Sequence, residues 1–410
     1  MSSDSRATIV QITNKTPHPN ADTLSIVNVL GDGSEGSGYP VVVKTSAVQI
    51  GDLALYVPVD MVCPDRPCFA FLGGREKDRR IEAKRLRGIF SMGLIIPARD
   101  LPIVMLEQDL PKFVSQDDFK TLVLIPATGA EVWSAPILAA RAEGKVSDRG
   151  HFLGMDLTDI LGFTKYEPPI QYARSMTGPG GKYIPGDTEF GISSTICPKY
   201  TDIENARRWP TAFYEGETVI MTEKVHGANA QFVFSDDRMI VGSHGRFVFP
   251  DSAGLWPDLA RKYKLADVLR QFPGMALYGE AFGYVQDLRY GLGTDVALAA
   301  FDIMDTSEGK YLDHDAFVSM LDTMNDVLAT LGGPDQPLVL RVPVLYRGPW
   351  LGLAAHKALA EGQSVIGIGT CIREGVVVRP ERERVTHGLG RTILKIVGET
   401  YLMRNRKVRA

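Results

Sequence analysis

The chain has few cysteines, and their spacing indicates neither a metal site nor a disulfide framework. Only four of the 410 residues are cysteine, and no two of them form a Cys-x-x-Cys pair. The seven histidines do not cluster with the spacing of metal ligands either. The sequence therefore disfavours a zinc site, and it disfavours a disulfide-stapled fold still more. The four cysteines are Cys63, Cys68, Cys197 and Cys371.

Long apolar segments are also missing. No run approaches the roughly 18 residues that a transmembrane helix needs. Residues 1–6 contain no signal-peptide core, and the chain has no Gly-x-x-x-x-Gly-Lys-Ser/Thr phosphate loop. We therefore expect a soluble cytoplasmic protein with no membrane partner, and not a P-loop nucleotide-binding protein.

Positive charge is not in excess, because 45 basic residues face 49 acidic ones for a net charge of −4. A nucleic-acid partner would therefore have to bind local basic patches. Residues 75–87 contain seven basic and three acidic residues, and residues 404–409 contain four basic residues and no acidic one. A solvated charged face is the alternative for either segment. The candidate nucleic-acid contacts are Arg79, Arg80, Lys84, Arg85 and Arg87.

The pattern of short apolar runs predicts an α+β protein in three parts. About five short strands separated by turns in residues 1–100 are typical of a small barrel, and the OB-fold is the obvious one. Residues 101–197 are expected to be a connector, with a short helix at 156–162 that ends at a glycine and a loop at 175–186. Residues 198–410 are expected to form a mixed α/β domain with helices at 256–272 and 314–332.

One lysine has a special setting. Lys224 follows the strand-like run 218–222 and precedes His226, Gly227 and a second apolar-rich run at 231–234. A glycine here permits a sharp bend and a close approach of backbone to a ligand. A solvated lysine beside a hairpin turn is the alternative interpretation.

The pattern Lys-x-His-Gly resembles the nucleophile motif of the lysyl-AMP nucleotidyltransferases, which are the ligases and RNA-capping enzymes. The longer string from Thr222 to Asn229 resembles RNA ligases of the RNA ligase 2 type. Four further segments match that superfamily's motifs in the required order. They are 276–283 with Glu280, 299–303 with Phe301, 373–380 with Glu374, and 393–397 with Lys395.

The resemblance implies roles for the catalytic residues. Lys224 would become lysyl-AMP, Glu374 would engage the metal and the lysine amine, and Lys395 would bind the α-phosphate. A free lysine has a pKa of about 10.4, so its amine must lose a proton before it can attack phosphorus. Lys395 and Mg²⁺ (or Mn²⁺) would supply positive charge that favours this loss and stabilises the phosphoryl oxygens.

The resemblance also implies an ATP-binding set. Glu280 would bind the ribose hydroxyls, and Phe301 would stack on the adenine. Glu223 points away from Lys224 along the strand, so it is not the base, and its family match lies near the adenine. Asn229 would act in steps after lysine adenylation, and Arg246 would contact phosphate, although a solvated arginine is equally compatible with the turn. The full ATP-binding set is Glu223, Lys224, Gly227, Asn229, Arg246, Glu280, Phe301 and Lys395.

The N-terminal part resembles OB domains of the tRNA-binding type, on residues 18–25 and 85–94. An OB module ahead of a ligase core resembles the Deinococcus-type RNA ligase family. Two departures stand out. Val397 occupies the place where many relatives have a second lysine, and the chain ends within 15 residues of Lys395, without the helical C-terminal domain of the RNA ligase 2 type.

Together these patterns predict an N-terminal OB-fold β-barrel followed by a covalent nucleotidyltransferase domain with an ATP-grasp-like ligase core. The expected function is an ATP-dependent RNA ligase that seals 3′-OH/5′-phosphate breaks. Its expected partner is a nicked RNA or RNA-containing duplex, and its cofactors would be ATP as AMP donor and Mg²⁺ (or Mn²⁺). The alternatives are a capping-type guanylyltransferase, or a non-catalytic RNA-binding protein on a ligase scaffold.

Overall fold

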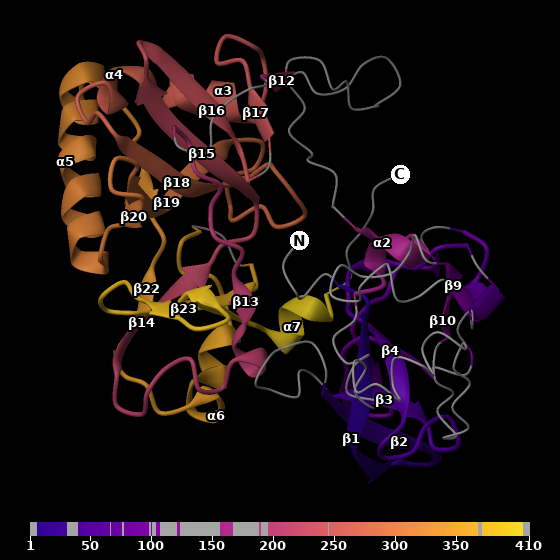
Figure 1. The fold of residues 1–410 in the computed structure, drawn as a ribbon. Helices are drawn as coiled ribbons and strands as arrows, with labels where there is room; N and C mark the ends of the chain where they lie inside the picture. Colours follow the sequence, from indigo (N-terminus) through magenta and orange to yellow (C-terminus); the bar gives the residue numbers. More distant parts are fainter. Residues whose placement is uncertain are drawn as a thin grey trace, which may run out of the picture. The chain divides into compact units, whose positions relative to one another are not determined.

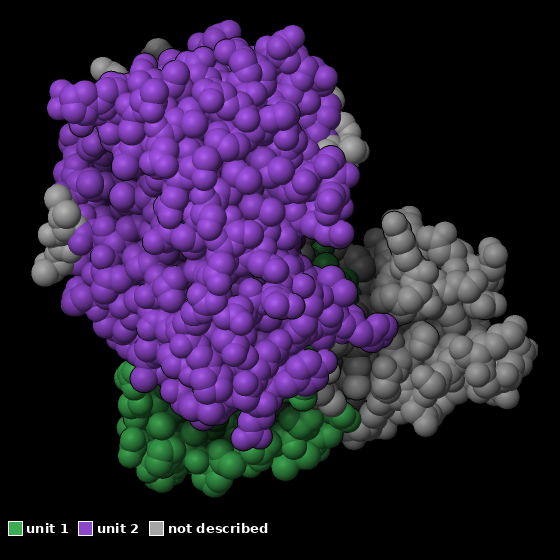
Figure 2. Space-filling view, turned by 90° about the vertical axis from the view of Figure 1, so that its left-hand side faces the viewer, with its two compact units in different colours: residues 1–167, 204–211 green, residues 168–203, 212–410 purple. Residues whose placement is uncertain are grey.

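A computed structural model describes most of the chain, in two compact units. Unit 1 comprises residues 1–167 with 204–211, and unit 2 comprises residues 168–203 with 212–410 (Figure 2). The predicted connector 101–197 and its loop at 175–186 lie largely outside the described residues. The residues described are 6–30, 40–65, 67–75, 78–97, 100, 104–106, 121–123, 156–166, 188–189, 196–244, 246–367 and 371–404.

Unit 1 contains a five-stranded antiparallel sheet in the order β3-β2-β1-β4-β8. Two hydrogen bonds of 3.0 Å draw the two edges together into a nearly closed barrel: Met92 N donates to the carbonyl oxygen of Pro40, and Val42 N donates to the side-chain hydroxyl of Ser91. Alternate apolar residues, among them Val10, point into its core. This confirms the predicted OB-fold. The strands are β1 (Thr8–His18), β2 (Ala21–Leu30), β3 (Val41–Lys44), β4 (Leu53–Val57) and β8 (Leu94–Pro97).

Smaller elements complete unit 1. The short helix predicted at 156–162 is present as α2 (Thr158–Leu161), and Gly162 ends it with φ of 85°, a left-handed conformation that glycine adopts without strain. The remaining elements are β5 (Met61–Val62), η2 (Pro67–Leu72), β6 (Lys84–Leu86), β7 (Ile89–Ser91), β9 (Val104–Leu106), β10 (Thr121–Val123), β11 (Thr164–Lys165), β13 (Glu204–Asn205) and η7 (Ala206–Arg208).

Unit 2 is built on two sheets. The larger has the strand order β12-β17-β16-β15-β18-β19-β20, with β21 beside β19, and the smaller contains β26-β23-β14-β22 in that order. The large-sheet strands are β12 (Thr188–Glu189), β15 (Ala228–Ser235), β16 (Arg238–Ser243), β17 (Arg246–Val248), β18 (Met275–Gly283), β19 (Val296–Asp305), β20 (Lys310–Tyr311) and β21 (Leu340–Arg341). The small-sheet strands are β14 (Thr218–Lys224), β22 (Val344–Pro349), β23 (Gly375–Pro380) and β26 (Leu394–Val397).

Helices α3 (Leu255–Lys262), α4 (Leu265–Leu269) and α5 (His314–Gly332) cover one face of the large sheet (Figure 1). Their apolar residues share one core with alternate residues of β15, β16, β18 and β19. The predicted helix at 314–332 is confirmed by α5. Further short elements are β24 (Val385–Thr386), β25 (Gly390–Arg391), α6 (Leu353–His356), η8 (Lys357–Ala360) and α7 (Glu399–Leu402).

The single helix predicted at 256–272 is wrong, because the chain breaks at Lys264, whose φ is 47°. The break follows Tyr263, whose ring is buried and whose hydroxyl accepts a hydrogen bond from Leu298 N at 3.2 Å. It redirects the chain so that Leu265 and Leu269 also enter the core. Among the described residues, no helix is long and apolar enough to cross a membrane.

Candidate active site

Lys224 is the last residue of β14, where that strand pairs with the start of β23. In the antiparallel register Lys224 lies opposite Gly375, next to Glu374. The Lys224 Nζ is 2.6 Å from the Glu374 Oε1, and the two side chains are 26% and 11% exposed. Two residues that are 150 positions apart in the sequence thus form an ion pair, as the motif resemblance predicts.

Strand register places Lys395 on the same face of the small sheet. Lys395 pairs with Val377, which pairs with Thr222, and Thr222 is two residues from Lys224. Side chains two residues apart on a strand point to the same face. Val397 pairs with Gly375 and therefore stands in the same row as Lys224. The position of the expected second lysine is thus apolar, and Gly375 of β23 separates it from Lys224.

The connection after Lys224 depends on glycine. A Cβ on Gly227 would come within 1.9 Å of the carbonyl oxygen of Ala281, so only glycine lets this turn pass against β18. The turn leads directly into β15, where Asn229 pairs with Glu280 of β18. Directly paired residues share a face, so the structure brings Asn229 and Glu280 together.

Electrostatics single out Glu280. Burial raises its pKa to about 7, the Glu374 carboxylate adds to the rise, and Lys224 and His226 oppose it. Burial would also raise the pKa of Glu374, but Lys224 and His226 outweigh that effect and lower it to about 2. Neighbouring carboxylates whose pKa values move apart are typical of functional sites.

A β-bulge presents Phe301. Tyr278 pairs with Asp302 while Gly279 pairs with Ala300, which leaves Phe301 as the extra residue of β19. Bulges commonly re-aim a side chain next to an active site. The Phe301 ring lies 4.8 Å from the Tyr200 ring, centroid to centroid, and remains partly exposed.

Glu223 points away from Lys224, as expected. Its side chain is 0% exposed, and the Oε2 accepts a hydrogen bond from Val365 N at 2.8 Å. Its Oε1 is buried without a hydrogen-bond partner, and so is the Oδ1 of Asn229. Buried polar atoms are normally satisfied, so each orphaned acceptor calls for a donor.

The structure does not bring Arg246 to the face of the sheet that holds Asn229 and Glu280. Arg246 is two residues from Val248, which packs in the helix-covered core, whereas Phe247 packs on the opposite face. Strand alternation therefore places Arg246 with Val248. Burial lowers the pKa of the Arg246 guanidinium. Its phosphate contact stays a prediction.

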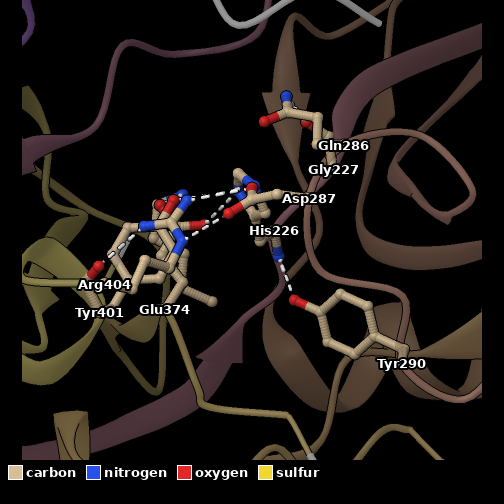
Figure 3. Close-up of polar contacts among 9 residues, drawn as sticks. His226, Gly227, Gln286, Asp287, Tyr290, Glu374, Tyr401 and Arg404 are labelled. Atoms are coloured by element: carbon tan, nitrogen blue, oxygen red, sulfur yellow. Dashed lines mark hydrogen bonds and ion pairs between the residues drawn. The ribbon is translucent and has the colours of Figure 1, made fainter. Parts of the chain in front are cut away.

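His226 connects the nucleophile motif to residues that the sequence did not single out (Figure 3). Its Nε2 lies 2.7 Å from the Asp287 Oδ1, and its Nδ1 lies 3.6 Å from the Glu374 Oε2. Burial would lower the pKa of His226, but the hydrogen bond to Asp287 and the nearby Glu374 carboxylate outweigh it and raise the pKa. In the sequence, Asp287 stands out only as a charged residue between the apolar residues Val285 and Leu288.

The basic residues of unit 1 fall into two groups. Arg79 donates to the carbonyl oxygens of Cys63 and Gly74, and Arg80 pairs with Asp60 at 2.5 Å. The other three lie exposed on or beside the hairpin formed by β6 and β7. These three are Lys84, Arg85 and Arg87.

The hairpin is braced from the turn between β1 and β2. The Nε2 of His18 lies 3.0 Å from the carbonyl oxygen of Leu86, and the amide of Asn20 donates to the carbonyl oxygen of Arg87 at 3.0 Å. The segment that resembles tRNA-binding OB domains thus fixes the backbone that presents the exposed basic side chains.

Comparisons with known proteins agree with this architecture. Residues 217–397 match the family described as RNA ligase, and residues 6–98 match an OB-fold domain family. A structure of Naegleria gruberi RNA ligase with AMP and Mn has a TM-score of 0.68 and 22% identity, and the match covers 97% of this chain and 98% of that chain. A second structure of that ligase, with PPi, has a TM-score of 0.66 and 23% identity over the same shares.

At this identity the solved structures establish the fold. Among curated proteins the comparison found no match. The family match spans β14 to β26 and includes Lys224, Glu280, Phe301, Glu374 and Lys395. Residues 217–397 are therefore similar to the RNA ligase family, and residues 6–98 are similar to OB-fold domains.

Proposed function

We propose that this protein is an ATP-dependent RNA ligase of the Deinococcus type that seals 3′-OH/5′-phosphate breaks, above all nicks in duplexes with an RNA 3′-OH end. The observation that supports this most is the 2.6 Å pair of Lys224 and Glu374, with Lys395 on the same face of the sheet. A nucleophilic amine, a carboxylate and a second cation are the groups that nucleotidyl transfer requires. The Naegleria gruberi ligase has been solved with ATP, AMP and Mn.

The residues fit an adenine nucleotide. The unpartnered Glu223 Oε1 and Asn229 Oδ1 are acceptors, and the amino group and ribose hydroxyls of ATP are donors. Phe301 offers a ring on which a purine would stack, worth about 1–3 kcal/mol. Glu280, with a pKa near 7, would gain a hydrogen-bonded partner in the ribose.

Glu374 offers a carboxylate to a divalent cation, although the described residues contain no group of three or more His, Cys, Asp or Glu side chains that could hold a metal ion. Glu374 would hold Mg²⁺ or Mn²⁺ through the carboxylate that the Lys224 amine now contacts. When bound, such an ion supplies positive charge at the transferring phosphoryl group and weakens the Lys224–Glu374 ion pair.

The chain's own residues then account for the first step. Lys224 must lose a proton, to the Glu374 carboxylate that it contacts or to water, before its nitrogen can attack. The neutral amine forms a P–N bond to the α-phosphorus, and the bond to the pyrophosphate oxygen breaks, so that pyrophosphate leaves. Lys395 stabilises the negative charge that gathers on the α-phosphate oxygens.

Two further transfers would complete sealing. AMP moves from Lys224 to a 5′-phosphate end, with restoration of the free amine, and a 3′-hydroxyl then displaces AMP to form the phosphodiester. Asn229, which is paired with Glu280, would act in these later steps. The test is incubation with α-labelled ATP and Mg²⁺, followed by nicked duplexes with RNA or DNA at each end. A guanylyltransferase would take label from GTP instead, and a non-catalytic scaffold would take none.

RNA binding would involve the exposed hairpin residues. Lys84, Arg85 and Arg87 can each contact a phosphate, whereas Arg79 and Arg80 already hold the fold of unit 1 and would contribute less. Replacing the three exposed residues by alanine should weaken duplex binding and reduce the log–log salt slope by about 2 to 3. Arg75→Ala is the matched control, since Arg75 is 70% exposed but paired with Asp78. An unchanged slope in the triple variant would remove this hairpin from the RNA interface.

A further inference from the structure

The last described residues of the chain return to the nucleophile motif. After β26, Gly398 N donates to the carbonyl oxygen of Glu374 at 2.9 Å, and the backbone of Glu399 donates to the Glu361 carboxylate at 2.6 Å. These contacts hold α7 against the strand that begins beside Glu374. The segment 398–404 is therefore packed at the site, although all of the family's motifs lie before it.

His226 is fixed on three sides (Figure 3). Its Nε2 lies 2.7 Å from the Asp287 Oδ1, its Nδ1 lies 2.9 Å from the Tyr401 hydroxyl, and its backbone N–H donates to the Tyr290 hydroxyl at 2.6 Å. The side chain of His226 is only 7% exposed. A ring bonded through both nitrogens has one orientation available to it.

Arg404 holds the partners of that ring. Its Nε donates to the Asp287 Oδ2 at 2.8 Å, and one terminal nitrogen reaches the Oδ1 at 3.2 Å. Another donates to the carbonyl oxygen of Tyr401 at 2.8 Å, and the guanidinium lies 3.6 Å from the centroid of the Tyr401 ring. The side chain is 8% exposed. An arginine that donates two hydrogen bonds to one carboxylate holds it in a defined position and also stabilises its negative charge.

His226 also lies next to Glu374, the carboxylate that contacts Lys224. The Glu374 Oε2 is 3.6 Å from the His226 Nδ1, and the Oε1 of the same carboxylate is 2.6 Å from the Lys224 Nζ. The carboxylate is thus held between the fixed imidazole and the nucleophile. A loose His226 would leave Glu374 free to turn away from Lys224.

We propose that Arg404 and Tyr401 are positioning residues for lysine adenylation, which act by clamping Asp287 and His226 so that Glu374 stays directed at Lys224. This inference rests on the proposed function, because it assigns a role within that reaction. It extends the site to a segment beyond the last motif, and it makes residues 398–404 part of the machinery that forms lysyl-AMP.

The experiment measures single-turnover lysyl-AMP formation over a range of ATP and Mg²⁺ concentrations. Arg404→Ala should lower the maximal rate by about 10- to 100-fold, the usual cost of mispositioning, while the ATP concentration for half-maximal rate changes less than about twofold. Arg404→Lys should restore part of the rate. The double variant Arg404→Ala/Asp287→Asn should be no slower than the slower single variant, because both residues act through one contact.

Arg347→Ala is the matched control. Arg347 also donates to both oxygens of one carboxylate, that of Asp315. Its side chain, however, is 43% exposed and lies away from this cluster. It should adenylate at the wild-type rate. If Arg404→Ala does not fold, Arg404→Lys and Tyr401→Phe decide the matter, and both should be slowed with unchanged thermal midpoints.

Wild-type rates in folded variants of Arg404 and Tyr401 would overturn the inference while leaving the proposed function intact. A rate loss accompanied by an equal rise in the half-saturating ATP concentration would also overturn it, since that pattern indicates a role in binding ATP. If the wild-type protein takes no label at all, the proposed function itself fails, and the inference fails with it.

Discussion

Two clusters of buried charge in unit 2 differ in the carboxylate and amide oxygens that lie in and around them. The nucleophile cluster contains Lys224, His226, Asp287, Glu374 and Arg404. The Asp302 cluster contains Tyr200, Asp302, His314, Arg379 and Arg391. Both combine carboxylates with cations at 2.6–2.8 Å, and both include a buried histidine.

The Asp302 cluster satisfies its central carboxylate. The Oδ1 accepts from Arg379 at 2.7 Å, and the Oδ2 accepts from the Tyr200 hydroxyl at 2.7 Å and lies 2.8 Å from Arg391. Burial would raise the pKa of Asp302, but the two arginines outweigh it and lower the pKa. Since Asp302 is on β19 and Arg379 is on β23, these bonds join the two sheets.

Beside the nucleophile cluster, by contrast, buried acceptors lack partners. The Oε1 of Glu223, the Oδ1 of Asn229 and the Oε1 of Gln286 are all buried without a hydrogen bond. Each such atom costs about 1–3 kcal/mol. Buried charge therefore stabilises the fold where it is fully paired. Buried oxygens without a hydrogen-bond donor destabilise the folded protein, and a bound nucleotide that donates to them would offset this loss.

Removing the centre of the Asp302 cluster should have the largest effect on stability. Asp302→Ala would leave Arg379 without its closest carboxylate in a buried setting, which costs about 3–5 kcal/mol of unfolding free energy. Denaturant unfolding measures this. Asp315→Ala is the control, because its pair with Arg347 is exposed to solvent and contributes little to stability. Equal destabilisation by the two substitutions would contradict the structural role of the Asp302 cluster.

The same kind of change in the nucleophile cluster should affect chemistry more than stability. Glu374→Gln keeps the shape of the side chain but removes its charge, so label transfer from ATP should fall about 10²- to 10³-fold. The loss of stability should be smaller than for Asp302→Ala, because Lys224 is 26% exposed and can be hydrated. Adenylation at the wild-type rate would remove Glu374 from the site.

A smaller effect is expected from pH on the Asp302 cluster. Burial and the Arg379 charge lower the pKa of His314 to about 4. Because the ordinary value is about 6.5, the unfolded chain binds this proton first, so stability is lost as pH falls from about 6.5 towards 4. His314→Gln, which can still accept from Arg379, should show a weaker dependence of the thermal midpoint on pH in that range. Parallel curves for the two proteins would contradict this assignment.

Linear motifs were sufficient to predict the OB-fold, the ligase-type core and the pairing of Lys224 with Glu374. The OB-fold follows from the strand pattern, whereas the ligase-type core and the pair of Lys224 with Glu374 follow from the resemblance to nucleotidyltransferase motifs. The contacts of Asp287, Tyr401 and Arg404 were not predicted, because His226 meets Tyr401 across 175 positions and no local pattern encodes that meeting.

Charge runs were only partly informative. The sequence shows seven basic residues at 75–87 but does not say which of them turn inward. Arg80 lies 3.7 Å from the Tyr166 ring centroid and pairs with Asp60, whereas Lys84 remains exposed. Similarly, the helix predicted at 256–272 runs across Lys264, where the chain takes a left-handed conformation and divides into α3 and α4.

We propose that Lys224 is the residue that becomes covalently adenylated. The most direct measurement is peptide mass spectrometry after incubation with ATP and Mg²⁺, on the wild-type protein and on Lys224→Ala. We predict an added AMP on the Lys224 peptide of the wild-type protein, loss of that AMP on addition of nicked RNA duplex, and no adenylation of the variant. AMP on a different residue, or undiminished adenylation of Lys224→Ala, would contradict the account.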